Sequence, residues 1–229
     1  MTLTLLGFID FIGTIAFAIS GAIVGIHRKM DLFGVNVLAI VTSTGGGVIR
    51  DLLIGTIPPT MFRNPFYVAV AAVTANIVFA LIYRHRHMPQ RLAPIYDSML
   101  FWFDSLGLGA FAVDGVMIGV RAGYGDNLFL IVFLGFLAGV GGGVLRDVLA
   151  DRTPDILVKH VYALAAIAGA LVTGVLLRFT GGTRIPMLSG FTIVIVIRVL
   201  AAHYLWNLPR IEEEWKDGDN RWDSMNKPV

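Results

Sequence analysis

The residues best suited to chemistry in this chain lie in a seven-residue motif that occurs twice. The first copy is GGGVIRD, Gly45 to Asp51, and the second is GGGVLRD, Gly141 to Asp147. Each copy lies in an apolar segment long enough to span a membrane. An intramembrane charge costs about 2.5–3.5 kcal/mol on insertion scales, and a helical glycine costs about 1 kcal/mol relative to alanine. A chain that tolerates these costs twice is expected to use both copies of the motif for its function.

Three consecutive glycines predict a break in each of the two helices that carry the motif. A face for close helix packing needs one small residue per turn, not three in a row. A break would free backbone carbonyls at the negative end of a half-helix, where a cation is stabilised. In the first copy, hydroxyl groups would add further oxygen ligands. The predicted pore and ion pathway therefore contains Thr42, Ser43, Thr44, Gly45, Gly46, Gly47, Gly139, Val140, Gly141, Gly142 and Gly143.

The arginine of each motif needs an acidic partner if it is not to repel cations. Arg50 lies about 4.5 Å past its glycines along a helix, toward the outside, and Arg146 lies equally far past its own, toward the cytoplasm. Depth in the membrane matches Arg50 with Asp10 and Arg146 with Asp104. Such a pair either fixes helix packing or forms part of a gate, and the sequence leaves both open.

The remaining buried charges have less specific predictions. Asp51 and Asp147 are expected to face aqueous vestibules or to cap neighbouring helices. Arg198 lies deep in the last apolar segment and should face protein near the inner carboxylate. Asp114 occupies the position of Ser20 in the repeat and is expected in a vestibule. No acidic or histidine group has metal-ligand spacing, so we predict no transition metal, only transient K⁺ or Na⁺, and no cofactor.

Composition sets the class of protein. Of the 229 residues, 56% are hydrophobic and only 15% are charged, and the mean hydropathy is +0.74. Soluble domains contain about 25% charged residues, so the chain is an integral membrane protein. The net charge of +2 is too small to indicate a nucleic-acid partner. Asp10 interrupts the first apolar run, which favours a retained span over a cleaved signal.

The predicted fold class is an all-α bundle with seven transmembrane helices. A span needs about 20 mostly apolar residues, and the segments that meet this requirement are Leu3–Ile26, Leu32–Ile54, Pro65–Tyr83, Ser98–Val120, Asn127–Ala150, Val158–Leu177 and Pro186–Trp206. Two homologous stretches relate the first span to the fourth: DFIGTIAFAISG from Asp10 and DSLGLGAFAVDG from Asp104. Each repeat then holds three helices, and an odd number inverts the second repeat in the membrane, as in channels and transporters.

The repeat divides the chain into four parts. Residues 1–94 form the first repeat, 95–180 the inverted repeat, 181–206 an additional seventh helix and 207–229 a polar cytoplasmic tail. Lys and Arg are more frequent in the loops on one side, which predicts a multi-pass protein of the inner (plasma) membrane. The N-terminus would be outside and the C-terminus in the cytoplasm. The loop charges used are Arg28, Lys29, Arg84, Arg86, Arg91, Arg152 and Lys159 inside, and Arg63, Arg121, Arg178 and Arg184 outside.

From about residue 4 to 206, the chain resembles prokaryotic members of the trimeric intracellular cation (TRIC) channel family. The resemblance rests on the paired GGGxxRD motifs, the three-plus-three repeat and the lone seventh span. It implies a homotrimer in which each subunit has its own pore, lined by the two glycine-containing helices and permeable to K⁺ and Na⁺. Membrane lipids are further partners. Animal members bind phosphoinositides through a basic motif near the second triplet, where this chain has Val144 and Leu145 before Arg146.

The same bacterial domain is also described as a glycine transporter in related proteins, which gives an alternative function. A carrier of a small zwitterion would hold its carboxylate with an arginine and half-helix N-termini, and Arg50 and Arg146 suit that role. An enzyme is not predicted, because no nucleophile and base lie at one depth. Physical reasoning reaches an inverted-repeat permeation protein, and the resemblance favours the channel.

Overall fold

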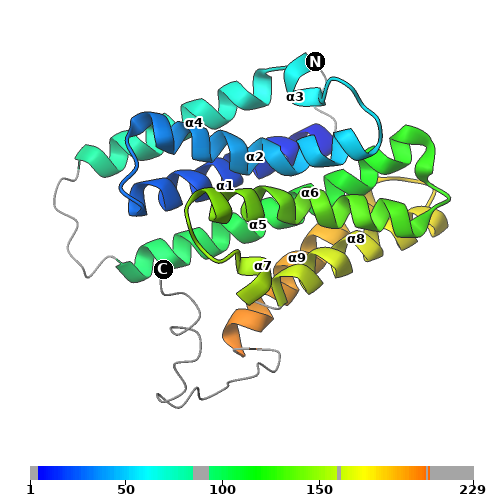
Figure 1. Cartoon of the computed structure of the whole chain (residues 1–229). Helices are drawn as coiled ribbons and strands as arrows, with labels where there is room; N and C mark the ends of the chain where they lie inside the picture. The colour runs from blue at the N-terminus through cyan, green and yellow to red at the C-terminus, as the bar shows by residue number, and fades with distance from the viewer. Residues whose placement is uncertain (1–4, 85–92, 159–160, 205, 207–229) are drawn as a thin grey trace, which may run out of the picture.

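The computed structural model describes residues 5–84, 93–158, 161–204 and 206, and these form a bundle of helices without strands (Figure 1). Seven helices in this part of the chain are long and apolar enough to cross a membrane, as predicted. They are α1 (Leu5–His27), α2 (Leu32–Leu53), α4 (Phe66–Arg84), α5 (Ala93–Gly119), α6 (Leu128–Leu149), α8 (Val161–Phe179) and α9 (Arg184–His203). The short helices α3 (Thr60–Arg63) and α7 (Asp155–Val158) follow the two motifs. The predicted tail, 207–229, and loop residues Arg86, Arg91 and Lys159 lie outside the described residues.

The two motif-bearing helices begin in the same way. The Asp31 Oδ1 atom accepts a hydrogen bond from the Gly34 backbone N–H at 2.8 Å, and the Asn127 side chain accepts one from Leu130 N–H at 3.0 Å. A side-chain oxygen at the N-cap satisfies a backbone donor that has no partner within the helix. The fourth span is longer than predicted at both ends, because α5 begins at Ala93 and continues as a π-helical turn, η2 (Val120–Tyr124), in which Gly123 has a φ of 92°. Glycine adopts this left-handed conformation without a Cβ clash, so the helix can end there.

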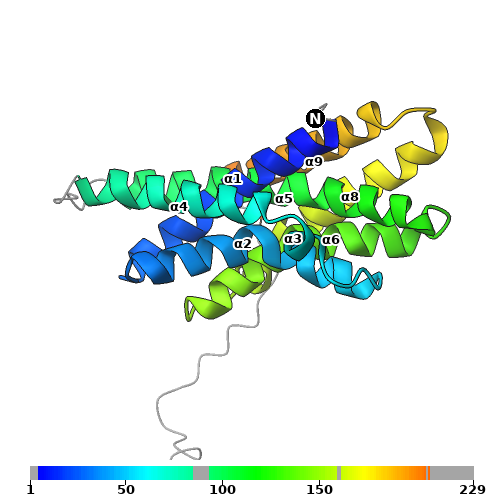
Figure 2. The same ribbon diagram turned by 90° about the horizontal axis from the view of Figure 1, so that it is seen from above.

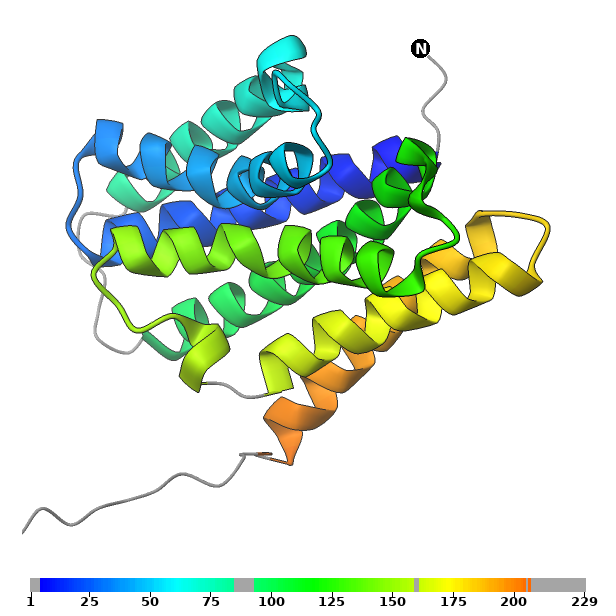
Figure 3. The same ribbon diagram turned by 45° about the vertical axis from the view of Figure 1, so that its right-hand side comes forward.

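The halves are arranged as an inverted repeat requires. The α1–α2 turn and the α5–α6 turn lie at opposite ends of the bundle, and α2 and α6 lie side by side and run in opposite directions (Figures 1 and 3). In the first half α4 packs against α1 and α2, and in the second half α8 packs against α5 and α6. Seen from above, α4 and the α8–α9 pair lie on opposite sides of the bundle (Figure 2). The seventh span, α9, packs on α8 and α5.

The predicted helix breaks at the glycine triplets are not present, and this detail of the predicted fold needs correction. The α2 and α6 helices are continuous through both triplets, and no residue inside either helix has non-helical backbone angles. The carbonyls of residues 42–44 and 138–140 therefore lie within regular helix. The polar ends of half-helices, on which the predicted cation ligands depended, do not form.

The glycines instead allow α2 and α6 to cross in very close contact. A Cβ atom on Gly46 would lie 2.3 Å from the Ala138 carbonyl oxygen, and one on Gly142 would lie 2.0 Å from the Thr42 carbonyl oxygen. The residues of each triplet face different neighbours. In the first triplet, Gly46 meets the partner backbone, and a Cβ on Gly47 would have Arg50 Nη2 as its nearest neighbour, at 3.7 Å. Gly45 and Gly46 are thus explained by two separate close contacts, with the Leu145 side chain and with the Ala138 backbone, which the one-per-turn argument overlooked.

Candidate functional site

The outer motif arginine, Arg50, is buried in a network of carboxylates. Its Nε and Nη2 atoms donate to Asp51 Oδ1 at 2.9 and 2.8 Å, and its Nη1 atom donates to Asp114 Oδ2 on α5. The other oxygen of Asp51 accepts from the Thr60 backbone N–H at 2.8 Å. Asp51 therefore binds the neighbouring guanidinium and caps α3, one of the two roles expected for it.

The predicted partner of Arg50 was Asp10, and the structure corrects this to Asp114. Asp10 lines the same outer cavity but makes no ion pair with Arg50 within 4 Å in the described structure. Helices α1 and α5 run in opposite directions, so Asp10 near one start and Asp114 near the other end reach the same depth. Depth alone could not separate the two carboxylates. The sequence did mark Asp114, as the counterpart of Ser20 in the repeat.

The inner motif arginine, Arg146, is fully buried and makes the corresponding contacts. Its Nη1 atom donates to Asp104 Oδ1 at 2.5 Å and to the Ser20 hydroxyl, and its Nε atom donates to Asp147 Oδ1 at 2.9 Å. The structure thus brings Arg146 and Asp104 together, as their depth predicts. Asp147 Oδ2 accepts from the Asp155 backbone N–H at 3.0 Å and so caps α7. Each motif is therefore one structural unit: an arginine held by the adjacent aspartate, which also fixes the following short helix.

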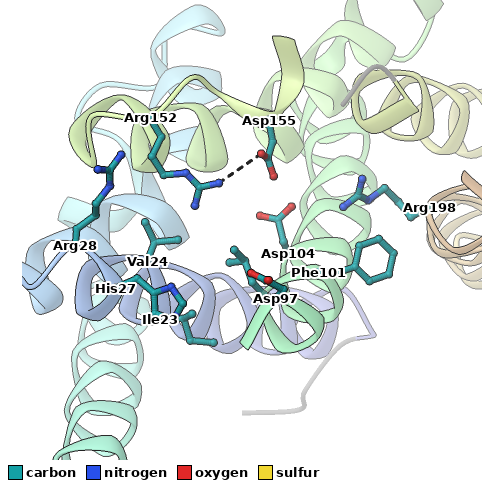
Figure 4. Close-up of a pocket in the computed structure, with 11 residues that line it drawn as sticks. Ile23, Val24, His27, Arg28, Asp97, Phe101, Asp104, Arg152, Asp155 and Arg198 are labelled. Carbon is teal, nitrogen blue, oxygen red and sulfur yellow. Dashed lines mark ion pairs between the residues drawn. The ribbon is translucent and has the colours of Figure 1, made fainter. Parts of the chain in front are cut away.

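The inner cavity lies beside this unit and has a volume of about 470 Å³ (Figure 4). Arg198 enters it from α9, as expected for a residue near Asp104, which lines the same cavity. The Arg198 guanidinium carbon lies 4.8 Å from the ring centroids of both Phe101 and Tyr162, and its Nε atom donates to the Ser105 hydroxyl at 3.1 Å. The charged residues lining the cavity are three carboxylates and three guanidiniums: Asp97, Asp104, Asp155, Arg28, Arg152 and Arg198.

The outer cavity is smaller, with a volume of about 80 Å³, and its walls are rich in oxygen atoms. Ser43 and Thr44 line it, and both hydroxyls donate to the Ile40 carbonyl, at 3.1 and 2.7 Å. Thr42, also in the predicted pathway, is buried and donates to the Leu38 carbonyl instead. The predicted pathway residues therefore divide into three groups. Ser43, Thr44 and Gly47 line the outer cavity, and Thr42, Gly45, Gly46, Gly141 and Gly142 pack in the helix crossing. Gly139 and Val140 pack against Leu108 and Ala112 of α5, and a Cβ atom on Gly143 would face Tyr162, Arg146 and Asp104.

An aromatic pair that sequence reasoning missed lies between the two cavities. Phe17 is completely buried, and its ring centroid lies 5.3 Å from that of Phe111, which lines the outer cavity. A Cβ atom on Gly107 would lie 2.0 Å from the Phe17 ring, and one on Gly142 would lie 3.3 Å from it. The ring thus fills the space between α1, α5 and α6. The only signal was the repeated Ala-Phe-Ala within the two homologous stretches, which place Phe17 and Phe111 at equivalent positions.

Comparison with known proteins agrees with this architecture. A family model described as "Glycine transporter" matches residues 7–83 and 101–178, the two repeats. A solved structure described as a TRIC trimeric intracellular cation channel orthologue from Rhodobacter sphaeroides superposes with a TM-score of 0.79 at 30% identity, covering 89% of this chain and all of that one. A second, from work on conductance through TRIC cation channels, gives a TM-score of 0.77 at 33% identity and covers 90% of this chain and 97% of that one. The chain belongs to the TRIC channel family.

Curated relatives place it among bacterial members of this family. A UPF0126 membrane protein of Deinococcus radiodurans is 42% identical over 167 residues, which are 72% of this chain and 73% of the relative. Another UPF0126 membrane protein, from Bacillus subtilis, is 35% identical over 201 residues, 88% of this chain and 94% of that one. The family assignment thus extends over both repeats. It identifies the chain as a multi-pass membrane protein.

Proposed function

We propose that this TRIC-family protein is a channel for monovalent cations, K⁺ and also Na⁺, with one pathway in each subunit. The observation that carries the proposal is the pair of cavities with charged residues in their walls, each beside a buried motif arginine, on either side of the α2–α6 crossing. Solved structures of similar sequence and fold are described as cation channels. In this proposal ions pass from the outer cavity, along the crossing near Gly47 and Gly143, into the inner cavity.

The arginines are compatible with cation passage because carboxylates neutralise them. Arg50 contacts two aspartates, and Arg146 contacts two aspartates and a serine hydroxyl. Their positive charge is thus compensated within hydrogen-bonding distance, where the attraction is strongest. In the outer cavity, lined by Asp10, Asp51 and Asp114, carboxylates outnumber guanidiniums and would attract cations.

We further infer a homotrimer, with the N-terminus outside and the C-terminus in the cytoplasm. Support for the oligomer comes from a similar solved structure that is described as a trimeric channel. Support for the orientation comes from the loop charges: Arg28, in the α1–α2 turn, donates to the Asp151 carbonyl, and Arg28 and Arg152 both line the inner cavity (Figure 4). Helix α4 buries only Ala71 and Ala75 of its residues within the subunit, so most of its apolar surface is available to lipid or to another subunit.

Purified protein in planar bilayers under a KCl gradient is expected to give a reversal potential close to that of K⁺. Selectivity should follow from the excess of carboxylates over guanidiniums in the outer cavity. Replacing KCl by NaCl on one side tests the relative permeability of Na⁺. A reversal potential near that of chloride, or no conductance from well-folded protein, would contradict the proposal.

A carrier of a small zwitterion remains the second candidate, because the inner cavity presents both charges that an amino acid needs. The Asp104 carboxylate and the Arg198 guanidinium line it together. The family model also carries the description "Glycine transporter". Proteoliposomes loaded with unlabelled glycine and offered labelled glycine separate the two functions: exchange without conductance supports a carrier, and conductance without exchange supports a channel.

Phe17→Ala is expected to increase K⁺ conductance severalfold, because the ring separates the two cavities. Removing it opens a void beside Phe111 of the outer cavity wall, and along α1 Phe17 lies between Thr14 of the outer cavity and Ile23 of the inner cavity. Loss of a buried phenylalanine also costs about 3–5 kcal/mol of stability, so conductance should be recorded per folded trimer. Phe129→Ala provides the control, since that side chain is 80% exposed on α6. Unchanged single-channel conductance in Phe17→Ala would show that the barrier lies elsewhere.

A further inference from the structure

The two motif sites differ in charge at one position of the repeat. Ser20 on α1 accepts a hydrogen bond from Arg146 in the inner site, and its counterpart on α5, Asp114, pairs with Arg50 in the outer site. The outer cavity is consequently lined by three carboxylates, Asp10, Asp51 and Asp114, and one guanidinium, Arg50. The inner cavity is lined by equal numbers of carboxylates and guanidiniums. The outer site therefore contains negative charge that its lining residues do not compensate.

Two carboxylate oxygens in this cavity lack a hydrogen-bond donor among the described residues. They are Asp10 Oδ1 and Asp114 Oδ1, and both are inaccessible to bulk solvent. Asp114 is only 3% exposed, and its other oxygen is held by Arg50, which fixes its orientation toward the cavity. The two carboxyl groups lie close enough to interact directly. A pair of buried carboxylates in contact needs a positive charge between or beside them, from a cation or a proton.

The neighbouring hydroxyls can complete a cation site. Ser43 and Thr44 use their protons in bonds to the Ile40 carbonyl, so the remaining lone pairs of each oxygen are free to bind a positive ion. Gly47 lines the same cavity without a side chain and leaves room for the ion. The cavity volume of about 80 Å³ exceeds the roughly 30 Å³ that one water occupies in the liquid, so an ion with a water ligand fits.

We propose that the outer cavity holds a monovalent-cation site, formed by the carboxylates of Asp10 and Asp114 with the hydroxyls of Ser43 and Thr44, and that protons compete with the cation for it. The proposal rests on the function proposed above and names the site that the permeating ion occupies. Among the described residues that line the outer cavity, two buried carboxylate oxygens are unpartnered, and Arg50 lies beside them, whereas Ca²⁺ takes six to eight oxygen ligands. This ligand set favours K⁺ or Na⁺.

The other charged and titratable groups near the two carboxyls come from every neighbouring element. Arg50 and Asp51 face them from α2, Tyr67 lines the cavity from α4, and Arg121 in η2 acts on Asp10 from the outer end of the bundle. Arg50 is already held by Asp51 and Asp114, so it does not neutralise both members of the pair. Acidic solution on the outer side should therefore empty the site of its cation by protonating a carboxyl.

The test measures cation-dependent stability and needs no ion flow. Purified protein is heated in detergent at constant ionic strength while choline chloride is replaced by KCl, at pH 7.5 and at lower pH. Wild type should show a saturable rise in its unfolding midpoint, and the half-saturating K⁺ concentration should increase by up to about tenfold per pH unit, as competition by one proton requires. NaCl should act similarly, and CaCl₂ should not act at lower concentration than KCl.

The variants identify the site. Asp114→Ser installs the residue found at the inverted position and should abolish the K⁺-dependent shift, and Asp10→Asn should do the same without removing a partner of Arg50. Asp151→Asn is the matched control, because this carboxylate is exposed and lies on the opposite side. A shift that persists in both site variants, a wild-type midpoint independent of K⁺, or tighter binding of Ca²⁺ would overturn the proposal. If wild type conducts K⁺ in bilayers but its unfolding midpoint does not depend on K⁺, this inference alone fails. If the midpoint rises with K⁺ but the protein does not conduct, the cation site is retained and the channel function is refuted.

Discussion

Asp104→Asn is expected to lower the free energy of unfolding by about 3–5 kcal/mol, the range for breaking a buried ion pair by removing one partner. Arg146 is completely buried, and its Nη1 atom contacts Asp104 Oδ1 at 2.5 Å. An asparagine keeps the shape but leaves the guanidinium with only Asp147 as its carboxylate partner. The cost is the uncompensated buried charge, because the lost contact itself is largely offset by the desolvation that it required.

The double variant Asp104→Asn with Arg146→Gln should be less damaging than Asp104→Asn alone. Without the guanidinium, Asp147 still accepts from the Asp155 backbone and has Arg152 at 3.9 Å. A double-mutant cycle in mixed micelles measures the coupling energy, which for residues in one network is about 0.5–3 kcal/mol. Asp97→Asn, on the wall of the same cavity, controls for loss of a carboxylate outside this network. A coupling energy below about 0.5 kcal/mol would show that the pair contributes independently.

The sequence was sufficient to predict the architecture, because a membrane restricts the length, polarity and direction of the helices that cross it. Span length, the doubled motif and the odd number of helices per repeat predicted seven spans and their inversion, and the helices begin and end within a few residues of the predicted bounds, except at α5. The short helices that follow each motif were not predicted. They depend on Asp51 and Asp147 accepting from backbone N–H groups eight or nine residues later, which is a tertiary contact.

The carboxylate partner of a motif arginine was predicted correctly only where depth in the membrane alone identified it. Arg146 and Asp104 follow from depth, but at the outer site Asp10 and Asp114 share a depth, and rotation about the helix axes selects Asp114. The same limit explains why Phe17 was missed: a phenylalanine in an apolar span has no sequence feature that places it between two cavities. The glycine triplets were interpreted from backbone propensity alone, whereas their role depends on which helix crosses at that point.

Gly142→Ala and Gly46→Ala should each destabilise the fold, because the added methyl group has no space at the crossing of α2 and α6. The new Cβ would lie 2.0 Å from the Thr42 carbonyl oxygen in the first variant and 2.3 Å from the Ala138 carbonyl oxygen in the second. Both obstacles are backbone atoms, so relief requires the helices to move apart. Overpacking of this kind costs about 1–3 kcal/mol and occasionally more, and the same displacement should alter K⁺ conductance.

Gly47→Ala is the matched control from the same triplet. Its Cβ would have only ordinary contact, 3.7 Å from the Arg50 Nη2 atom, and alanine in place of glycine favours a helix by about 1 kcal/mol. We therefore expect unfolding in mixed micelles to show neutral or increased stability for Gly47→Ala and a loss for Gly46→Ala. A helix break at the triplet predicts the opposite ranking, because alanine at any of the three positions would then oppose the break and Gly46 would have no special cost. Equal effects at the two positions would refute the close crossing, and with it the explanation of Gly46 and Gly142.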